Sequence, residues 1–322
     1  MPHFDLPIDQ LRAYRPEVRV PADFAGFWRR TIADARKAGG EASFTPAETP
    51  LVGCRVLDVR FPGFAGDPIA GWLLLPPGDG PHPAVVQFLG YGAGRGLPHE
   101  YLPWVTAGYA CLVMDTRGQG STWGAGGTTP DPHGSGPAAN GAVTRGIEDP
   151  ETYYYRRLFT DAVRAVDAVR EHPSVDAARV AVSGGSQGGG LALAAAGLSD
   201  GLMAVLADVP FLCHFERAVG LTDREPYAEI ARYLGVHRES TERVFDTLSY
   251  FDGVNLAGLA TAPALFSVAL MDQICPPSTV FAAFNAYAGP KEITVHAYNG
   301  HEGGAAAQWP RQAALLAEAA RA

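Results

Sequence analysis

One serine of this chain stands in a setting that would make it a nucleophile. Ser186 is the centre of residues 184–188, which read Gly-Gly-Ser-Gln-Gly and have the form G-x-S-x-G. Residues 179–183 before it have the apolar pattern of a short buried strand, and residues 189–197 after it are rich in Gly, Leu and Ala, as in a helix. A serine on a sharp turn from strand to helix lifts its hydroxyl clear of the sheet, beside helix N-terminal N–H groups that can stabilise an oxyanion. We expect glycine on both sides because the backbone angles of such a turn tolerate only small neighbours.

The motif alone is weak evidence for catalysis. The chain has 38 Gly among 322 residues, so an ordinary Gly-rich turn between a strand and a helix would look the same. A serine hydroxyl is also a poor nucleophile near neutral pH unless a histidine accepts its proton and a carboxylate orients that histidine. The interpretation of Ser186 therefore depends on partners elsewhere in the chain.

Two residues stand where those partners are expected. In α/β-hydrolases the chain order is Ser, then Asp or Glu, then His, so the acid should follow the next-to-last strand and the histidine the last. The strand-like run 264–269 is followed by Asp272, and the run 293–297 is followed by His301 in a Gly-rich loop. Catalytic groups of open α/β sheets gather at the carboxyl edge of the strands. We predict a Ser186–His301–Asp272 triad.

Each partner also has a structural interpretation, and other residues compete for both roles. A single Asp after a strand is usually a turn former or a helix cap, and a single loop histidine is usually exposed. His296 lies inside a predicted strand, whereas His214 and His237 precede the acid in the chain. Asp208 follows the strand directly after the motif, a less usual place for the acid, and Glu302 is next to the histidine in sequence, so its side chain should point elsewhere.

An oxyanion hole needs two N–H donors. The first is expected from Gln187, which follows the nucleophile, and the second from a loop after an early strand. The run 83–89 leads into a Gly-rich loop, where we assign the N–H of Tyr91, although a plain turn is an open alternative. Arg117 and Gln119 follow a later strand, and we expect Arg117 to be structural, pairing with a carboxylate or with carbonyls near the motif.

The elements along the chain indicate how these residues are positioned. Strand-like runs alternate with helical ones, which predicts an α/β-hydrolase fold with a mostly parallel central sheet of about eight strands and helices on both faces. We predict a single domain, 1–322, with an N-terminal helical extension over about 1–50 and a small helical cap insertion over about 211–251. A long Gly/Pro-rich segment, 124–141, is expected to be functional or to form an interface. The predicted strands are 54–61 and 69–76 as a hairpin, then 83–89, 110–114, 179–183, 203–207, 264–269 and 293–297; the main helices are 21–38, 155–171, 277–288 and 308–320.

The composition restricts the class of protein. The chain is 47% hydrophobic and 18% charged, as in folded globular proteins, and its net charge of −9 argues against nucleic acid or an anionic membrane surface as a partner. The first residues lack the apolar core of a signal peptide, and there is no apolar run of about 18 residues. Four scattered Cys without C-x-x-C spacing give no zinc pattern, so we expect neither metal nor cofactor, and a cytoplasmic protein.

The chain resembles the cephalosporin C deacetylase/acetyl xylan esterase family, carbohydrate esterase family seven, and does so over nearly its whole length. The resemblance rests on three signatures in order and on three further segments. The signatures are Arg117-Gly118-Gln119-Gly120, residues 184–189 and His301-Glu302; the segments are 144–147, 152–156 and 276–283.

The resemblance implies more than the spacing does. Such proteins are α/β-hydrolases that remove acetyl groups from small substrates, including acetylated xylo-oligosaccharides and cephalosporin C. The family's triad maps onto Ser186, Asp272 and His301, its oxyanion donors map onto the N–H groups of Tyr91 and Gln187, and its members typically assemble as hexamers. Many members have His where this chain has Leu89, a difference that bears on the pocket wall.

Two other kinds of function stay open at this point. One is a broader short-chain carboxylesterase or a serine peptidase of the same fold, although a peptidase of this type commonly carries an extra propeller, for which the chain has no room. The other is a hydrolase-fold binding protein without activity. Such proteins usually lack one triad member, whereas all three are present here.

Overall fold

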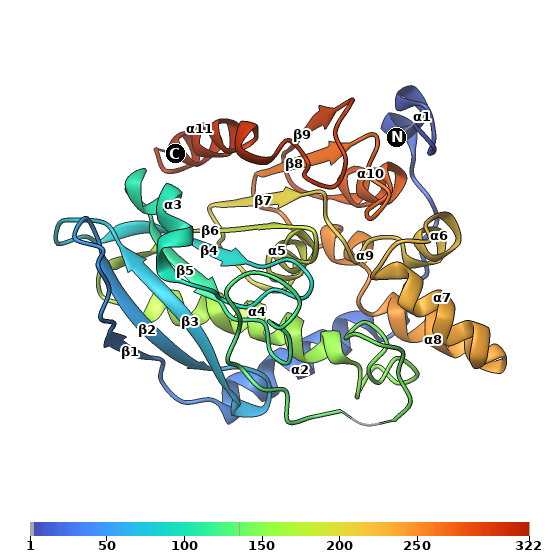
Figure 1. Ribbon diagram of the computed structural model, residues 1–322, viewed down its shortest axis with the longest axis horizontal. Coiled ribbons are helices and arrows are strands. Elements are labelled where there is room, and N and C mark those ends of the chain that lie inside the picture. The colour runs from blue at the N-terminus through green and yellow to red at the C-terminus, as the bar shows by residue number, and fades with distance from the viewer. Residues whose placement is uncertain (1–2, 135, 322) are drawn as a thin grey trace.

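A nine-stranded mixed sheet forms the centre of the computed structural model, which describes residues 3–134 and 136–321 (Figure 1). Its strand order is β1-β2-β3-β5-β4-β6-β7-β8-β9. The prediction of a mostly parallel α/β sheet is confirmed, and the one strand beyond the predicted eight is the short, largely exposed β1 at the sheet edge. The strands are β1 (Ser43–Pro46), β2 (Arg55–Pro62), β3 (Pro68–Leu75), β4 (His82–Phe88), β5 (Ala110–Met114), β6 (Val175–Gly185), β7 (Ala204–Asp208), β8 (Ala264–Ala269) and β9 (Lys291–His296).

The sheet divides into an antiparallel and a parallel part. Strands β1, β2, β3 and β5 pair antiparallel, and β2 with β3 forms the predicted hairpin, in which Arg55 lies opposite Leu75. From β5 through β4, β6, β7 and β8 to β9 all pairs are parallel. Strands β5 and β8 are buried along their whole length, which is why their sequences are continuous apolar runs without alternation.

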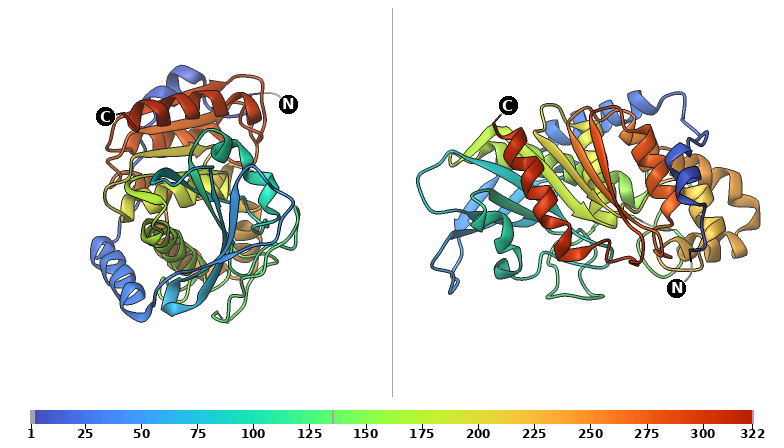
Figure 2. Two further views of the ribbon diagram at one scale, coloured as in Figure 1. Left: turned by 90° about the vertical axis from the view of Figure 1, so that its left-hand side faces the viewer. Right: turned by 90° about the horizontal axis from the view of Figure 1, so that it is seen from above.

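Helices cover both faces of the sheet (Figure 2). The larger hydrophobic cluster lies beneath α2, α4, α5 and α10, and the smaller one lies beneath α3 and α11. None of the described helices combines the length and the apolar character that a membrane crossing requires. The helices on the two faces are α2 (Phe24–Ala38), α3 (Leu102–Thr106), α4 (Tyr154–Glu171), α5 (Gln187–Leu198), α10 (Pro277–Ala286) and α11 (Trp309–Ala319).

A group of short helices lies between β7 and β8 in the chain, at the end of the sheet away from α3 (Figure 1). It covers the segment predicted as a helical insertion and continues slightly beyond it. A separate short helix, α1 (Ile8–Ala13), lies near the N-terminus and packs against α10. The helices of the group are α6 (Phe215–Leu221), α7 (Tyr227–Val236), the 3-10 turn Arg238–Ser240, α8 (Thr241–Ser249) and α9 (Gly253–Ala257).

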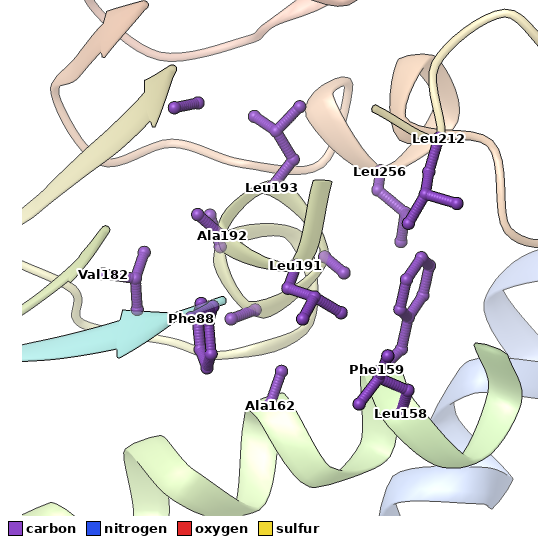
Figure 3. Packing of buried hydrophobic residues seen from close by; sticks show 14 of the residues in the cluster. Phe88, Leu158, Phe159, Ala162, Val182, Leu191, Ala192, Leu193, Leu212 and Leu256 are labelled. Carbon is purple, nitrogen blue, oxygen red and sulfur yellow. The ribbon is translucent and has the colours of Figure 1, made fainter. Parts of the chain in front are cut away.

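Helix α5 is buried on nearly all sides, so its sequence is made of small residues. Figure 3 shows Phe88 and Val182 of the sheet and Ala162 of α4 packed around its first turns. A Cβ on Gly190 would lie 2.4 Å from the carbonyl oxygen of Phe211. The glycines of α5 therefore let its backbone approach its neighbours more closely than alanine would allow.

The turn into α5 places the backbone strain on the serine and the close contacts on its glycines. Ser186 itself has the strained conformation, with φ 57° and ψ −120°, whereas Gly184, Gly185 and Gly188 do not have positive φ. A Cβ on Gly184 would lie 2.3 Å from the carbonyl carbon of Gly188, and a Cβ on Gly188 would lie 2.5 Å from the carbonyl oxygen of Phe88. The strained angles at Ser186 therefore go with small neighbours, as predicted: Gly184 and Gly188 are needed because no Cβ fits there, whereas Gly185 has room for one.

This geometry predicts a difference among three glycines of the motif. Gly184→Ala and Gly188→Ala should each lower the free energy of unfolding by about 1–3 kcal/mol, the usual cost of overpacking. Gly185→Ala should be close to the parent protein, because the nearest atom to its Cβ would be 3.9 Å away. Thermal unfolding of the three variants measures this. Equal melting temperatures for all three would contradict the packing argument.

Candidate functional site

Ser186 is held at the junction of β6 and α5 by its own main chain. Its N–H donates to the carbonyl of Asp208 at 2.9 Å, and its carbonyl accepts from the N–H of Gly190 at 3.1 Å and of Phe211 at 2.9 Å. A non-glycine residue with this φ and ψ is costly and persists only where its surroundings fix it. These bonds to the end of β7, to the segment after it and to α5 fix the conformation of Ser186 at the carboxyl edge of the sheet.

Asp272 and His301 meet at the same edge. The carboxylate oxygen Oδ2 of Asp272 lies 2.9 Å from Nδ1 of His301, and Asp272 is completely buried. The other oxygen, Oδ1, accepts from the N–H groups of Ile274 at 2.8 Å and Cys275 at 3.0 Å. Both oxygens are therefore occupied, which fixes the orientation of the carboxylate. In the tautomer whose Nδ1–H donates to this carboxylate, the lone pair of the imidazole is on Nε2.

The sheet topology explains why these residues come together. Strands β6, β7, β8 and β9 are consecutive parallel neighbours, so their carboxyl ends lie along one edge. Ser186 follows β6, Asp272 follows β8 and His301 follows β9. The side chain of His301 is 28% exposed, whereas that of Asp272 is inaccessible, so solvent or substrate reaches the site from the imidazole side.

The two other carboxylates considered as partners of His301, Asp208 and Glu302, bond to other residues. Asp208 points toward α11, where its Oδ2 accepts from Nε2 of Gln312 at 2.6 Å, and burial raises its pKa to about 6. Glu302 accepts from Nδ2 of Asn299 at 2.8 Å and is exposed. Asp272 is the carboxylate bonded to His301, which agrees with its selection from chain order.

A chain of side-chain amides ties the two predicted oxyanion segments together. Oε1 of Gln119 accepts from the N–H of Gly92 at 2.7 Å, and its Nε2 donates to Oε1 of Gln187 at 2.9 Å. Nε2 of Gln187 donates to the carbonyl of Leu89 at 3.3 Å. Leu89 is only 8% exposed and packs in the smaller hydrophobic cluster. The loop around Tyr91 is thus held to Gln187, the first residue of α5. An oxyanion hole formed by the N–H groups of Tyr91 and Gln187 would require these two segments to be held together.

Arg117 lies behind this network and is completely buried. Its guanidinium donates to both oxygens of Asp161, to Oδ2 of Asp67 at 2.9 Å and to Oδ1 of Asp131 at 3.4 Å. Asp131 belongs to the long Gly/Pro-rich segment and also receives two bonds from Arg157. Arg117 therefore joins α4, the loop before β3 and the Gly/Pro-rich segment through ion pairs, as its predicted structural role requires.

Two residues near the site were missed by sequence reasoning. Glu229 of α7 accepts from the Tyr91 hydroxyl at 2.9 and 3.0 Å, across 138 residues of chain, and no local pattern indicates such a contact. Cys275 is next to the triad: its Sγ, the Asp272 carboxylate and a ring nitrogen of His301 lie within 4.8 Å of one another. Its position three residues after Asp272, before a helix that starts with proline, was the available signal.

The thiol of Cys275 also faces Ser186. Burial raises the pKa of the thiol well above its usual value, and the nearby Asp272 carboxylate adds to this effect, whereas a hydrogen bond with the Ser186 side chain opposes it. The thiol is therefore protonated near neutral pH and does not replace the serine as a nucleophile.

The comparisons with known proteins give the family and the fold. The family model described as acetyl xylan esterase (AXE1) matches residues 1–318. The acetyl esterase Axe7A of Xylanibacter ruminicola is 28% identical over 297 residues, which are 89% of this chain and 65% of the relative. The chain thus spans about two thirds of the length of that protein.

Two solved acetyl xylan esterase structures are similar to this chain over nearly its whole length. An acetyl xylan esterase from Paenibacillus sp. R4 is 40% identical with a TM-score of 0.91, covering 97% of this chain and 99% of its own. Acetyl xylan esterase 1 from Thermoanaerobacterium sp. JW/SL YS485 is 34% identical with a TM-score of 0.90, covering 98% and 99%. An acylaminoacyl peptidase from Pyrococcus horikoshii, 15% identical with a TM-score of 0.58, covers 84% of this chain and 41% of its own, and shows only the shared α/β-hydrolase fold. The resemblance noted in the sequence is confirmed: the chain belongs to the acetyl xylan esterase family.

Proposed function

We propose that this protein is a serine esterase that removes acetyl groups from small acetylated substrates. The observation that carries the proposal is the 2.9 Å bond between a fully buried Asp272 and His301, at the sheet edge that also presents the strained Ser186. The names of its relatives, which are acetyl and acetyl xylan esterases, support acetyl as the acyl group. Acetylated xylo-oligosaccharides and cephalosporin C are the substrates that the family resemblance suggests.

The proposed reaction has two halves with a common geometry. Ser186 attacks the acetyl carbonyl while Nε2 of His301 takes its proton, and Asp272 stabilises the imidazolium that forms. The main-chain N–H groups of Tyr91 and Gln187 receive the oxyanion. His301 then protonates the leaving alcohol. Water attacks the acetyl-enzyme by the same route and releases acetate.

The position of Tyr91 is fixed at its far end. Its hydroxyl donates to Glu229 and accepts from the N–H groups of Ala142 and Val143, the latter at 3.1 Å. Glu229 is 3% exposed, and a Cβ on Gly141 would lie 2.2 Å from its carboxylate oxygens, so that glycine makes room for it. The helical insertion and the loop around residue 142 thereby hold the segment that would supply the second oxyanion donor.

Three further features belong to the same proposal. We propose a single domain with the helical insertion as a cap, a homohexamer and a cytoplasmic location; the assembly rests on the family resemblance and the location on the composition. Light scattering coupled to size-exclusion chromatography would test the assembly, and a monomer would remove it.

Loss of a triad side chain should abolish the activity. Ser186→Ala or His301→Ala should lower kcat for acetate release by several orders of magnitude, and Asp272→Asn by about 10⁴-fold, because the amide favours the wrong histidine tautomer. Glu302→Gln is the matched control, since Glu302 is exposed, bonds to Asn299 and should be dispensable. Near-parent activity of Ser186→Ala would refute the assignment.

The acyl group can be tested with one substrate series. Hydrolysis of p-nitrophenyl esters from acetyl to octanoyl should show the highest kcat/KM for acetyl. A preference for octanoyl would contradict the acetylesterase proposal and favour the broader carboxylesterase. Cleavage of amide substrates at rates comparable to esters would favour the peptidase.

The buried Glu229 predicts a pH-dependent stability. Burial raises the pKa of Glu229 from its ordinary value of 4.5 to about 7; the Tyr91 hydroxyl and Arg232 oppose this rise, whereas Glu225 adds to it. The folded state then binds the proton more tightly than the unfolded state, so the parent protein loses stability as the pH rises from about 4.5 to about 7. Glu229→Gln does not titrate there. Its melting temperature should rise relative to the parent between pH 5 and pH 8.

Melting temperatures of both proteins across this range measure the effect, with the exposed Glu239→Gln as a control from the same insertion. A difference between Glu229→Gln and the parent that stays constant with pH would contradict the prediction.

A further inference from the structure

Three side chains at the site have the chemistry of a metal-binding set. The carboxylate of Asp272, the thiol of Cys275 and the imidazole of His301 each offer one ligand atom, and these atoms lie within 4.8 Å of one another. Carboxylate oxygen, thiolate sulfur and imidazole nitrogen are the ligands that Zn²⁺ and Cd²⁺, its softer analogue, take in proteins. No other group of three His, Cys, Asp or Glu meets this distance among residues 3–134 and 136–321.

We propose that Asp272, Cys275 and His301 form an inhibitory site for a thiophilic divalent cation such as Zn²⁺ or Cd²⁺. Bonds to Zn²⁺ are about 2.0–2.3 Å long, so the ligand atoms of a tetrahedral zinc site are roughly 3.3–3.8 Å apart. The three atoms need to close by about 1 Å from their present limit of 4.8 Å. The side chain of His301 is 28% exposed, so a rotation of the imidazole about its side-chain bonds can make that move.

The positions of the ligands in the chain favour the site. Asp272 and Cys275 are three residues apart in the turn before α10, and Oδ1 of Asp272 already accepts from the N–H of Cys275. This turn fixes two ligands before the cation arrives. Three protein ligands leave the fourth position of a tetrahedral site to a water molecule.

Binding of the cation would remove the catalytic base. The thiol loses its proton to solvent as the S–metal bond forms, and one ring nitrogen of His301 gives its lone pair to the metal. A bond through Nε2 removes the acceptor for the Ser186 proton, and a bond through Nδ1 replaces the hydrogen bond to Asp272. In either case the triad is disrupted, so the cation inhibits reversibly. The inhibition rests on the proposed esterase function, whereas the binding does not.

Binding is tested without activity, on a Ser186→Ala protein titrated with Cd²⁺. The ultraviolet Cd–thiolate charge-transfer band should saturate at one Cd²⁺ per chain, and a chelator should remove it. The band should be lost when Cys275→Ala is added and kept when Cys54→Ser is added. Cys54 is the matched control, because it is the more accessible thiol while Cys275 is buried. An unchanged band in the Cys275→Ala protein, or its loss in the Cys54→Ser protein, would overturn the site.

Inhibition is tested by acetate release from the protein with its serine. Cd²⁺ and Zn²⁺ should inhibit the parent and Cys54→Ser alike, with recovery on chelation, and Cys275→Ser should need at least tenfold more cation for the same fractional inhibition. Equal potency against Cys275→Ser, or equal inhibition by Mg²⁺, would contradict the proposal. An inactive protein that keeps the Cd–thiolate band refutes the esterase function alone, and an active protein without the band refutes the metal site alone.

Discussion

The hydrogen bond between Asp272 and His301 is the interaction on which the site depends. It joins the segments that follow β8 and β9, and it is possible because these strands are parallel neighbours whose carboxyl ends lie together. Asp272 cannot rotate away, since its second oxygen accepts two main-chain N–H bonds in the turn before α10. A buried carboxylate held in this manner orients the imidazole and leaves its other nitrogen for the serine.

The strained turn at Ser186 is the second requirement, and the packing of α5 meets it. Ser186 keeps a positive φ because its main-chain N–H donates to the carbonyl of Asp208 and its carbonyl accepts from the N–H of Phe211. Glycines bring the helix against β4 and β6 so closely that no Cβ fits at two positions of the motif. The strain is thus offset by the core of the protein, and the polar network of Gln119 and Gln187 extends the same rigidity to the loop around Tyr91.

Much of this arrangement could be predicted from the sequence because it depends on local patterns and on chain order. Continuous apolar runs predicted both ends of β5 and β8 to the exact residue. The chain order Ser, Asp, His selected Asp272 and His301 from several candidates. The short exposed β1 has no apolar run to indicate it. The Glu229–Tyr91 contact and the approach of Cys275 to Ser186 depend on folding between distant segments, which no local spacing encodes. The need for small residues around the serine was predictable, but which glycines lack room for a Cβ depends on the packing of α5 against β4 and β6.

Active-site labelling shows whether His301 and Asp272 activate Ser186. A fluorophosphonate reacts with a serine only when a base and an oxyanion hole activate it. We expect one label per chain, mapped by mass spectrometry to Ser186, with labelling slowed by orders of magnitude in Asp272→Asn and His301→Ala. Absence of labelling in the folded parent protein, or labelling of a different serine at the same rate in all three proteins, would contradict this expectation and favour a binding protein with a hydrolase fold.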